Sequence, residues 1–265
     1  MSTLSIVIPS YNDADMLREC LRALAAQTRP PDEVIVVDNG STDDTAAVAT
    51  AAGARVVVEP VRGVLHATTA GFDAATGEII GRLDADSRPR PDWAARVESD
   101  FDGDPTLDAL TGGGVFYGGY AFWRFVGRWL YLGGYFVSMR LVLGRVPLFG
   151  SNFALRRQTW EELRGRIHLD DPRAHDDLDI TCVLDPYAGV DYDRTLLMPV
   201  SARPFDTFDG FRRRASWAFH LLGVNLHEVP WLTRIRMCAA GRRHRAARRR
   251  AASRVSARSV RASRE

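Results

Sequence analysis

Two aspartates one residue apart, Asp84 and Asp86, follow the apolar run of residues 79–83. In an extended strand the side chains alternate between faces, so both carboxylates would point one way and Ala85 the other. Two carboxylates on one edge suit Mg²⁺ or Mn²⁺, which keep their other positions for water and phosphate oxygens. An isolated pair of this kind is more often a solvated strand end, so the rest of the chain must decide its chemistry.

Strand-like and helical segments alternate up to this pair. Apolar runs at residues 4–8, 33–37, 55–58 and 79–83 have the length of buried strands, and helical spacing follows the first of them. The alternation predicts an α/β fold with a doubly wound, mostly parallel sheet flanked by helices. Ligands of such sheets bind beyond the carboxyl ends of the strands, so the polar residues that follow these strands are expected to share one crevice.

The polar residues after the first two strands are suited to binding a nucleotide. Asp38 can accept a hydrogen bond from a nucleobase N–H, and the ring of Tyr11 can stack beside the base. A cap or turn would explain Asp38 by itself. It would not explain three polar clusters at the ends of neighbouring strands.

Three stretches, in this order and spacing, resemble the inverting family 2 glycosyltransferases, which use nucleotide-sugar donors and have the Rossmann-like GT-A fold. They are Ile6-Val7-Ile8-Pro9-Ser10-Tyr11-Asn12, Val36-Val37-Asp38-Asn39-Gly40-Ser41-Thr42-Asp43 and Gly77-Glu78-Ile79-Ile80-Gly81-Arg82-Leu83-Asp84-Ala85-Asp86. The resemblance implies transfer of a sugar with inversion, assisted by a metal ion.

The resemblance also implies which residues bind the donor. They are Pro9, Tyr11, Asp13, Asp38, Arg62, Asp84, Ala85 and Asp86. Among them Asp84 and Asp86 are implied to hold Mg²⁺ or Mn²⁺ with the diphosphate and the sugar. Asp13 stands where the family often has Glu, and Arg62 lies where many members have Asn-x-Gly, a position from which it can approach the diphosphate.

Five aspartates between residues 170 and 179 form a run that is usually a solvated acidic face. Within it, residues 175–180 resemble the family's Glu-Asp-x-Asp-Leu segment, with Asp176 in place of Glu and Asp177 at the catalytic aspartate. An inverting transfer needs one carboxylate to take the proton of the acceptor hydroxyl and a cation on the departing diphosphate. Register favours Asp177 as the base, and Asp176 is the alternative.

Residues 211–217 partly resemble a Gln/Arg-rich stretch that contacts the diphosphate and acceptor in relatives. Arg213 and Arg214 are the corresponding donor-binding candidates, although a basic helix face explains them equally well. We expect a catalytic domain at 1–240, with a nucleotide-sugar-binding half at 1–110, an aromatic segment at 111–149 and an acceptor-binding half at 150–240. Residues 241–265 are expected to be an Arg-rich tail, disordered or helical only on contact.

The composition is that of a globular protein, with 46% hydrophobic and 26% charged residues among 265. The three cysteines are far apart and unpaired in spacing, which argues against disulfides or a zinc site and for a reducing compartment. Strand-like residues begin at Leu4 with no signal peptide ahead of them, so a cytoplasmic location is expected. Residues 242–265 contain ten Arg and one Glu, about +9, which leaves about −7 for the rest of a chain of net charge +2.

Residues 115–149 are rich in Tyr, Phe, Trp, Leu and Gly and are interrupted by four arginines, without a charge-free run long enough to cross a bilayer. A buried helical hairpin and a membrane-interfacial segment both fit this composition. The Arg-rich tail would bind anionic lipid headgroups, and nucleic acid only without specificity. A peripheral position on the inner face of the cell membrane follows from the interfacial interpretation.

The sequence therefore favours a glycosyltransferase that moves a sugar from a nucleotide-diphosphate sugar to a lipid-linked or cell-envelope glycan acceptor. Sugar-phosphate nucleotidyl transfer is an alternative, but residues 9–12 lack the Gly-rich basic loop that it usually needs. A noncatalytic binder of anionic membranes or polymers would explain the tail and none of the strand-end clusters.

Overall fold

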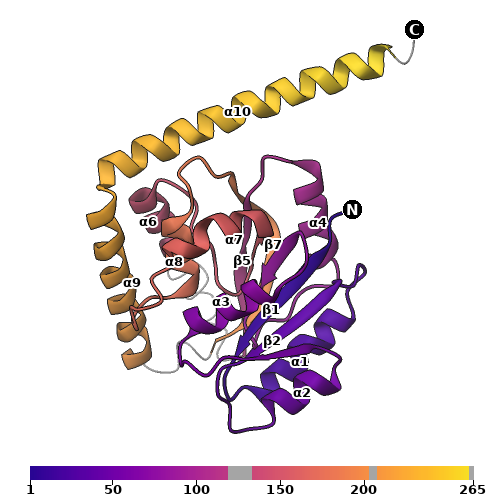
Figure 1. Cartoon of the computed structure of the whole chain (residues 1–265), viewed down its shortest axis with the longest axis vertical. Helices are drawn as coiled ribbons and strands as arrows, with labels where there is room; N and C mark the ends of the chain where they lie inside the picture. Colours follow the sequence, from indigo (N-terminus) through magenta and orange to yellow (C-terminus); the bar gives the residue numbers. More distant parts are fainter. Residues whose placement is uncertain (119–132, 203–207, 263–265) are drawn as a thin grey trace.

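The seven described strands form one mixed sheet, seen in a computed structural model that describes residues 1–118, 133–202 and 208–262 (Figure 1). Their order across the sheet is β3-β2-β1-β4-β6-β5-β7. β6 is antiparallel to β4 and to β5, and the other neighbouring pairs are parallel. The strands are β1 (Leu4–Ser10), β2 (Glu33–Asp38), β3 (Arg55–Val58), β4 (Ile79–Arg82), β5 (Ala109–Tyr117), β6 (Phe153–Arg156) and β7 (Val190–Ser201). The expected mostly parallel sheet with flanking helices is confirmed.

Helices cover both faces of the sheet because its central strands are apolar on both sides. Leu4, Ile6 and Ile8 of β1 belong to one buried cluster, and Val7 between them belongs to the other. The first face packs against α1 (Ala14–Ala25), α2 (Thr45–Ala51) and α4 (Trp93–Gly103). The second packs against α3 (Val64–Ala74), α7 (Arg157–Leu163) and α8 (Asp176–Val183).

The strand register brings the ends of β1, β2 and β4 to one edge of the sheet. Ser10 is opposite Asp38, the last residue of β2, and Val7 is opposite Arg82, the last residue of β4. The polar segments that follow these strands therefore leave the sheet side by side, as expected from the order of the elements.

A third group of helices packs outside α3 and α8. It comprises α6 (Gly133–Leu143), α9 (Phe208–Glu228) and α10 (Trp231–Ala262). Leu143, Leu178 and Leu221 are buried together and join α6, α8 and α9. Part of the expected aromatic segment is therefore helical and forms α6. Residues 119–132 of that segment lie outside the described residues. Among the described residues, no helix is both long and apolar enough to cross a membrane.

The Arg-rich residues 241–262 are helical, where the sequence predicts disorder unless they meet a partner. They continue α10, whose C-terminal part runs past the body of the molecule (Figure 1). Arg245 bonds to Asp104 at 2.5 Å and to Asp191 at 2.7 Å, and Arg249 contacts the same two carboxylates. Two arginines of the tail thus pair with carboxylates of their own chain.

Gly71 of α3 lies where that helix approaches the sheet closely. A Cβ atom on it would stand 2.3 Å from Val7 Cγ1 and 2.8 Å from Val37 Cγ2. We therefore expect Gly71→Ala to lower the free energy of unfolding by about 1–3 kcal/mol, the usual cost of overpacking. Chemical denaturation measures the change. Gly103→Ala is the control because a Cβ there meets nothing within 4 Å, and equal effects of the two would contradict the packing argument.

Candidate active site

Two loops that follow β1 and β2 lie side by side at the edge of the sheet where ligands of such folds bind. Asn12, in the left-handed region with φ 49°, accepts a hydrogen bond from Thr42 N at 2.8 Å and so joins the loops. The half-buried Asp38 accepts one from Ser41 N at 2.9 Å. The structure brings Pro9 and Asp13 to the same edge, since Pro9 is opposite Val37 in the sheet and Asp13 directly precedes α1.

Tyr11 and Arg62 stack on each other beside these loops. The guanidinium carbon of Arg62 is 3.1 Å from the centroid of the Tyr11 ring, which remains 45% exposed. The position of Arg62 depends on Asn39, which is buried. Asn39 Nδ2 donates to the carbonyl of Val61 at 2.7 Å, and its Oδ1 accepts from Gly63 N at 2.9 Å. An exposed aromatic ring and a guanidinium group are thus held together at this edge of the sheet.

Asp84 and Asp86 lie in a turn directly after β4. Ser87 N donates to the carbonyl of Asp84 at 3.0 Å, and Ser87 Oγ accepts from Asp84 N at 3.1 Å. The argument that strand alternation aligns the two carboxylates does not apply, because β4 ends at Arg82. Ala85 between them is buried in the core and fixes the turn against the sheet.

The two aspartates of this turn offer the oxygen ligands that a hard divalent cation requires. The Asp84 carboxylate is 38% exposed and accepts one hydrogen bond on each oxygen, from Arg82 and from Ser151. Each carboxylate oxygen has two lone pairs, so both oxygens of Asp84 can still bind a metal. Asp86 is half-buried, and its main-chain carbonyl accepts a hydrogen bond from the Tyr117 hydroxyl at 2.7 Å. Oxygen ligands of this kind match Mg²⁺ or Mn²⁺.

A buried arginine joins this turn to the start of α8. Arg82 is 1% exposed; its Nη1 contacts Asp84, and its Nη2 lies 2.8 Å from Asp176 Oδ2. Burial by itself would lower the pKa of Arg82, but the carboxylates of Asp176, Asp84 and Asp177 outweigh it and raise that pKa. The cation therefore stays charged and holds the two acidic segments together.

Asp176 is wholly enclosed. It has no exposed surface, and Thr68 of α3 donates to its Oδ2 at 2.6 Å, beside Arg82. Burial alone would raise the pKa of Asp176, but Arg82, His175 and Thr68 together hold it well below the usual range. Asp176 is therefore a permanent carboxylate that solvent does not reach.

Asp177 is not fully enclosed, since 14% of its side chain is exposed. Its Oδ2 accepts a hydrogen bond from Gly150 N at 2.9 Å, and its Oδ1 accepts one from Leu178 N at 2.7 Å. His175 Nδ1 is 2.9 Å from Asp177 Oδ1 and 3.1 Å from Asp176 Oδ1. Burial would lower the pKa of His175, but the two aspartates, Asp177 foremost, raise it to about 10.

The ligand atoms of His175, Asp176 and Asp177 all lie within 4.8 Å of one another, so they form a second group that could hold a metal ion. Their mutual contacts and the Arg82–Asp176 pair already balance much of the charge there. The side chains of Arg213 and Arg214 lie outside the described residues, although both residues are within α9.

Residues 5–164 match the protein family described as glycosyl transferase family 2, and they make up more than half of the chain. The chain belongs to this family. The match covers the crevice loops and the aspartate turn, while α8 lies beyond it.

Curated relatives of this glycosyltransferase resemble it over part of their length. Glycosyltransferase AglE of Haloferax volcanii is 34% identical over 120 residues, which are 42% of this chain and 39% of that protein. The undecaprenyl-phosphate 4-deoxy-4-formamido-L-arabinose transferase of Sodalis glossinidius is 38% identical over 104 residues, 36% of this chain and 32% of that protein. The chain thus matches less than half the length of these relatives.

Solved structures support the fold. Glucosyl-3-phosphoglycerate synthase of Mycobacterium tuberculosis, solved with Mn²⁺, UDP and glucosyl-3-phosphoglycerate, has a TM-score of 0.61 to this glycosyltransferase at 23% identity. The similarity covers 84% of this chain and 80% of that one. At this identity the comparison establishes the shared GT-A architecture alone.

Four residues of the site escape the sequence analysis: Arg82, Thr68, Ser151 and His175. Arg82 had a visible signal, because a charged residue stands inside a short apolar strand and a buried cation needs a carboxylate partner. Thr68 and Ser151 had none, since each is an ordinary polar residue whose partner is 67 or more positions away.

Removing Arg82 would leave Asp176 buried without its partner. We expect Arg82→Met to cost about 3–5 kcal/mol of stability, the usual effect of breaking a buried ion pair. Adding Asp176→Asn should recover part of this loss. Denaturant unfolding of the single and double variants measures the coupling, and strictly additive effects would contradict it. Arg157→Met is the matched control, since its pair with Glu161 is exposed on both sides and contributes less than about 1 kcal/mol.

Proposed function

We propose that this glycosyltransferase transfers a sugar from a nucleotide-diphosphate sugar to an acceptor hydroxyl with inversion of the anomeric carbon. The observation that carries the proposal is the Arg82 bridge, which joins the Asp84–Asp86 turn to the Asp176–Asp177 pair. The aspartates proposed to bind the leaving group thus lie next to the aspartate proposed to remove the proton, and the two groups belong to different elements of the fold. The presence of Mn²⁺ and UDP in the similar M. tuberculosis structure supports the donor class.

The donor would bind along the edge formed by β1, β2 and β4. Asp38 would accept a hydrogen bond from the nucleobase, and Tyr11 would stack beside it, with Pro9 and Asp13 completing this side of the pocket. Arg62, which is stacked on Tyr11, would meet the diphosphate. A guanidinium suits a diphosphate because it donates two parallel hydrogen bonds.

Asp177 would act as the general base. It would take the proton of the acceptor hydroxyl while that oxygen attacks the anomeric carbon and the bond to the diphosphate breaks. Gly150 N and Leu178 N fix its orientation, and its partial exposure lets an acceptor reach it. Asp176 is unsuited to this role, because it has no exposed surface and is paired with Arg82. It would instead orient its neighbour.

Asp84 and Asp86 would hold Mg²⁺ or Mn²⁺, which would supply positive charge to the departing diphosphate. Arg82 would hold Asp84 in place through the same contact that neutralises part of its charge. Arg213 and Arg214 remain candidates for further contacts to the diphosphate.

We propose a lipid-linked or cell-envelope glycan as the acceptor. The S. glossinidius relative, an undecaprenyl-phosphate 4-deoxy-4-formamido-L-arabinose transferase, supports this class. The protein would then work as a peripheral protein on the cytoplasmic face of the membrane, consistent with three free cysteines that are all buried. Specific nucleic-acid binding is not part of the proposal.

The base assignment predicts a separation of binding from turnover. Asp177→Asn should lower the transfer rate by about 10²–10⁴-fold, the usual contribution of a general base, and leave the donor Kd nearly unchanged. Calorimetry with the donor and a turnover assay measure the two effects. Asp170→Asn is the control, because it removes an exposed carboxylate of the same acidic run. A fully active Asp177→Asn enzyme would require another base.

The metal assignment predicts donor binding that depends on Asp86. In a thermal-shift panel of nucleotide sugars with Mg²⁺ or Mn²⁺, we expect one donor to stabilise the protein only when metal is present. At about 100 times its Kd a ligand stabilises by about 2.7 kcal/mol. Asp86→Asn should lose this metal-dependent part, so that its response equals that of the unaltered chain in chelator. Equal stabilisation with and without metal would rule out the role of Asp84 and Asp86.

A further inference from the structure

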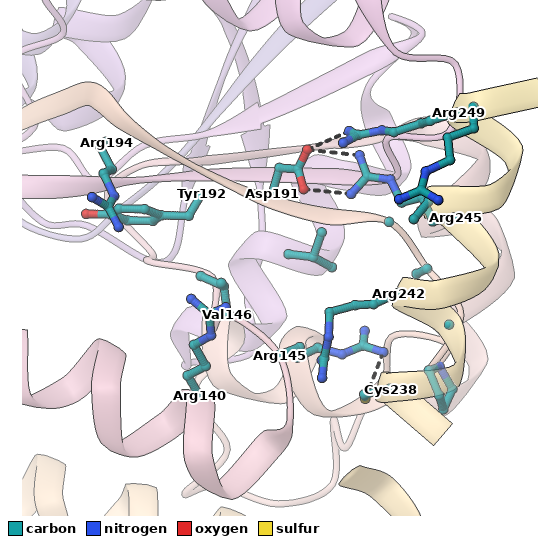
Figure 2. Close-up of a pocket in the computed structure, with 17 residues that line it drawn as sticks. Arg140, Arg145, Val146, Asp191, Tyr192, Arg194, Cys238, Arg242, Arg245 and Arg249 are labelled. Carbon is teal, nitrogen blue, oxygen red and sulfur yellow. Dashed lines mark hydrogen bonds and ion pairs between the residues drawn. The ribbon is translucent and has the colours of Figure 1, made fainter. Parts of the chain in front are cut away.

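A cavity of about 560 Å³ lies between the start of β7, the end of α6 and the middle of α10 (Figure 2). β7 begins at Val190, opposite the first residue of β5, Ala109. Because β6 is antiparallel to both β4 and β5, β5 and β7 run in the same direction as β4. The cavity is therefore at the opposite end of the sheet from the proposed active site. We call it the arginine cavity.

The arginine cavity carries a large excess of positive charge. Seven arginines and a single carboxylate, that of Asp191, line it. Asp191 pairs with Arg245 and Arg249 (Figure 2). Within the described part of the chain, the other five have no acidic partner: Arg140, Arg145, Arg194, Arg242 and Arg250. Like charges gathered at this density repel one another unless an anion joins them.

Arg145 is a buried arginine of the cavity that has an unused hydrogen-bond donor. Its side chain is only 7% exposed, and its Nη2 donates to the carbonyl of Asp185 at 2.6 Å and to Cys238 Sγ at 3.5 Å. Its Nη1 is buried and has no hydrogen-bond partner. A buried guanidinium N–H without an acceptor is costly, so an acceptor oxygen from water or from a ligand would stabilise this donor. Guanidinium groups match phosphate oxygens best.

Exposed apolar side chains next to the cavity indicate where such a phosphate comes from. Val137 and Leu141 of α6 are 63% and 67% exposed and lie one turn apart, and Arg140, which lines the cavity, follows Val137 at the spacing of helix neighbours. Trp231, at the start of α10, is 49% exposed and donates from Nε1 to the carbonyl of Leu141 at 3.3 Å. Leu232 beside it is 58% exposed.

This combination is typical of a surface that enters the membrane interface. Apolar and tryptophan side chains lie at the depth of the headgroups, while arginines reach the phosphates. A soluble phosphate would use the cationic cavity alone and leave the apolar surface of α6 and α10 unexplained. A nucleic acid would likewise leave it unexplained, since the exposed groups include two leucines and a valine.

We propose that the arginine cavity binds the phosphate of an anionic lipid while Val137, Leu141, Trp231 and Leu232 enter the membrane interface. The inference rests on the proposed work at a membrane, but it does not depend on the transfer reaction. It gives the membrane contact a defined place, with Arg145 at its base and Arg140 and Arg194 at its rim.

Flotation of the full chain with vesicles tests the proposal, comparing phosphatidylcholine alone with phosphatidylcholine plus phosphatidylglycerol. The double variant Arg140→Gln/Arg194→Gln removes two exposed arginines that have no acidic partner among the described residues, so folding should be unaffected, as thermal unfolding will verify. We expect its partition onto the anionic vesicles to fall about 30-fold, which is about 2 kcal/mol for two arginines at a membrane surface. An unchanged partition would overturn the proposal.

The matched control is Arg18→Gln/Arg22→Gln, which removes the same charge from α1, on the far side of the sheet. An equal loss in this control would mean attraction by net charge, and the cavity would have no special role. Val137→Ser/Leu141→Ser should weaken vesicle binding without changing the affinity for inorganic pyrophosphate, measured by calorimetry. If this variant binds vesicles normally, the apolar surface does not enter the interface and the proposal fails.

Two further measurements distinguish a lipid from a soluble phosphate compound and from a nucleic acid. Pyrophosphate binding that depends on Arg140 and Arg194, without any vesicle binding, would assign the cavity to a soluble phosphate compound instead of a lipid. Stronger binding of single-stranded RNA than of anionic vesicles, at equal phosphate concentration, would assign it to nucleic acid. Asp177→Asn should bind vesicles like the unaltered chain, so a failure of the proposed catalytic mechanism and a failure of this inference give different results.

Discussion

The contact of Arg82 with Asp84 and Asp176 is the interaction on which the proposed active site depends. It places a charged guanidinium in the interior, where neither it nor Asp176 meets water. Each ion would be costly there without the other, so the strand that ends at Arg82 and the helix that begins at Asp176 are held in one arrangement. Thr68 of α3 adds a hydrogen bond to the same carboxylate, so three elements from distant parts of the chain meet there. The proposed metal site and the proposed base therefore keep a fixed spacing.

Asn39 fixes the loop that carries Arg62 through hydrogen bonds of its side-chain amide. Arg82 fixes the two acidic segments through charge. Its buried amide spans the loop of residues 59–63, and its carbonyl accepts a hydrogen bond from Arg62. The stack of Arg62 on Tyr11 thus has a rigid base although the ring is exposed. An uncharged side chain is suited to this position, because it leaves the positive charge of Arg62 available for the proposed diphosphate.

The sequence predicts the strands and their meeting edge well, because buried parallel strands are short apolar runs that end in polar turns. Residues 4–8, 33–37, 55–58 and 79–83 all lie in or beside strands of the sheet. The contacts that tie the site together could not be predicted in this way. Arg82 and Asp176 are 94 positions apart in numbering, and no local periodicity reports such a pair. The pairing of Arg245 and Arg249 with Asp104 and Asp191 could not be predicted for the same reason, because these carboxylates lie far earlier in the chain.

The antiparallel direction of β6 has a consequence for how the chain between β5 and β6 is attached to the proposed site. A strand that runs backward presents its beginning at the edge where its neighbours end. The chain therefore leaves the site at Tyr117, whose hydroxyl contacts Asp86, and returns at Ser151, whose hydroxyl contacts Asp84. Both ends of the intervening segment are fastened to the same turn. A substitution between these two ends would therefore leave both contacts with the Asp84–Asp86 turn in place.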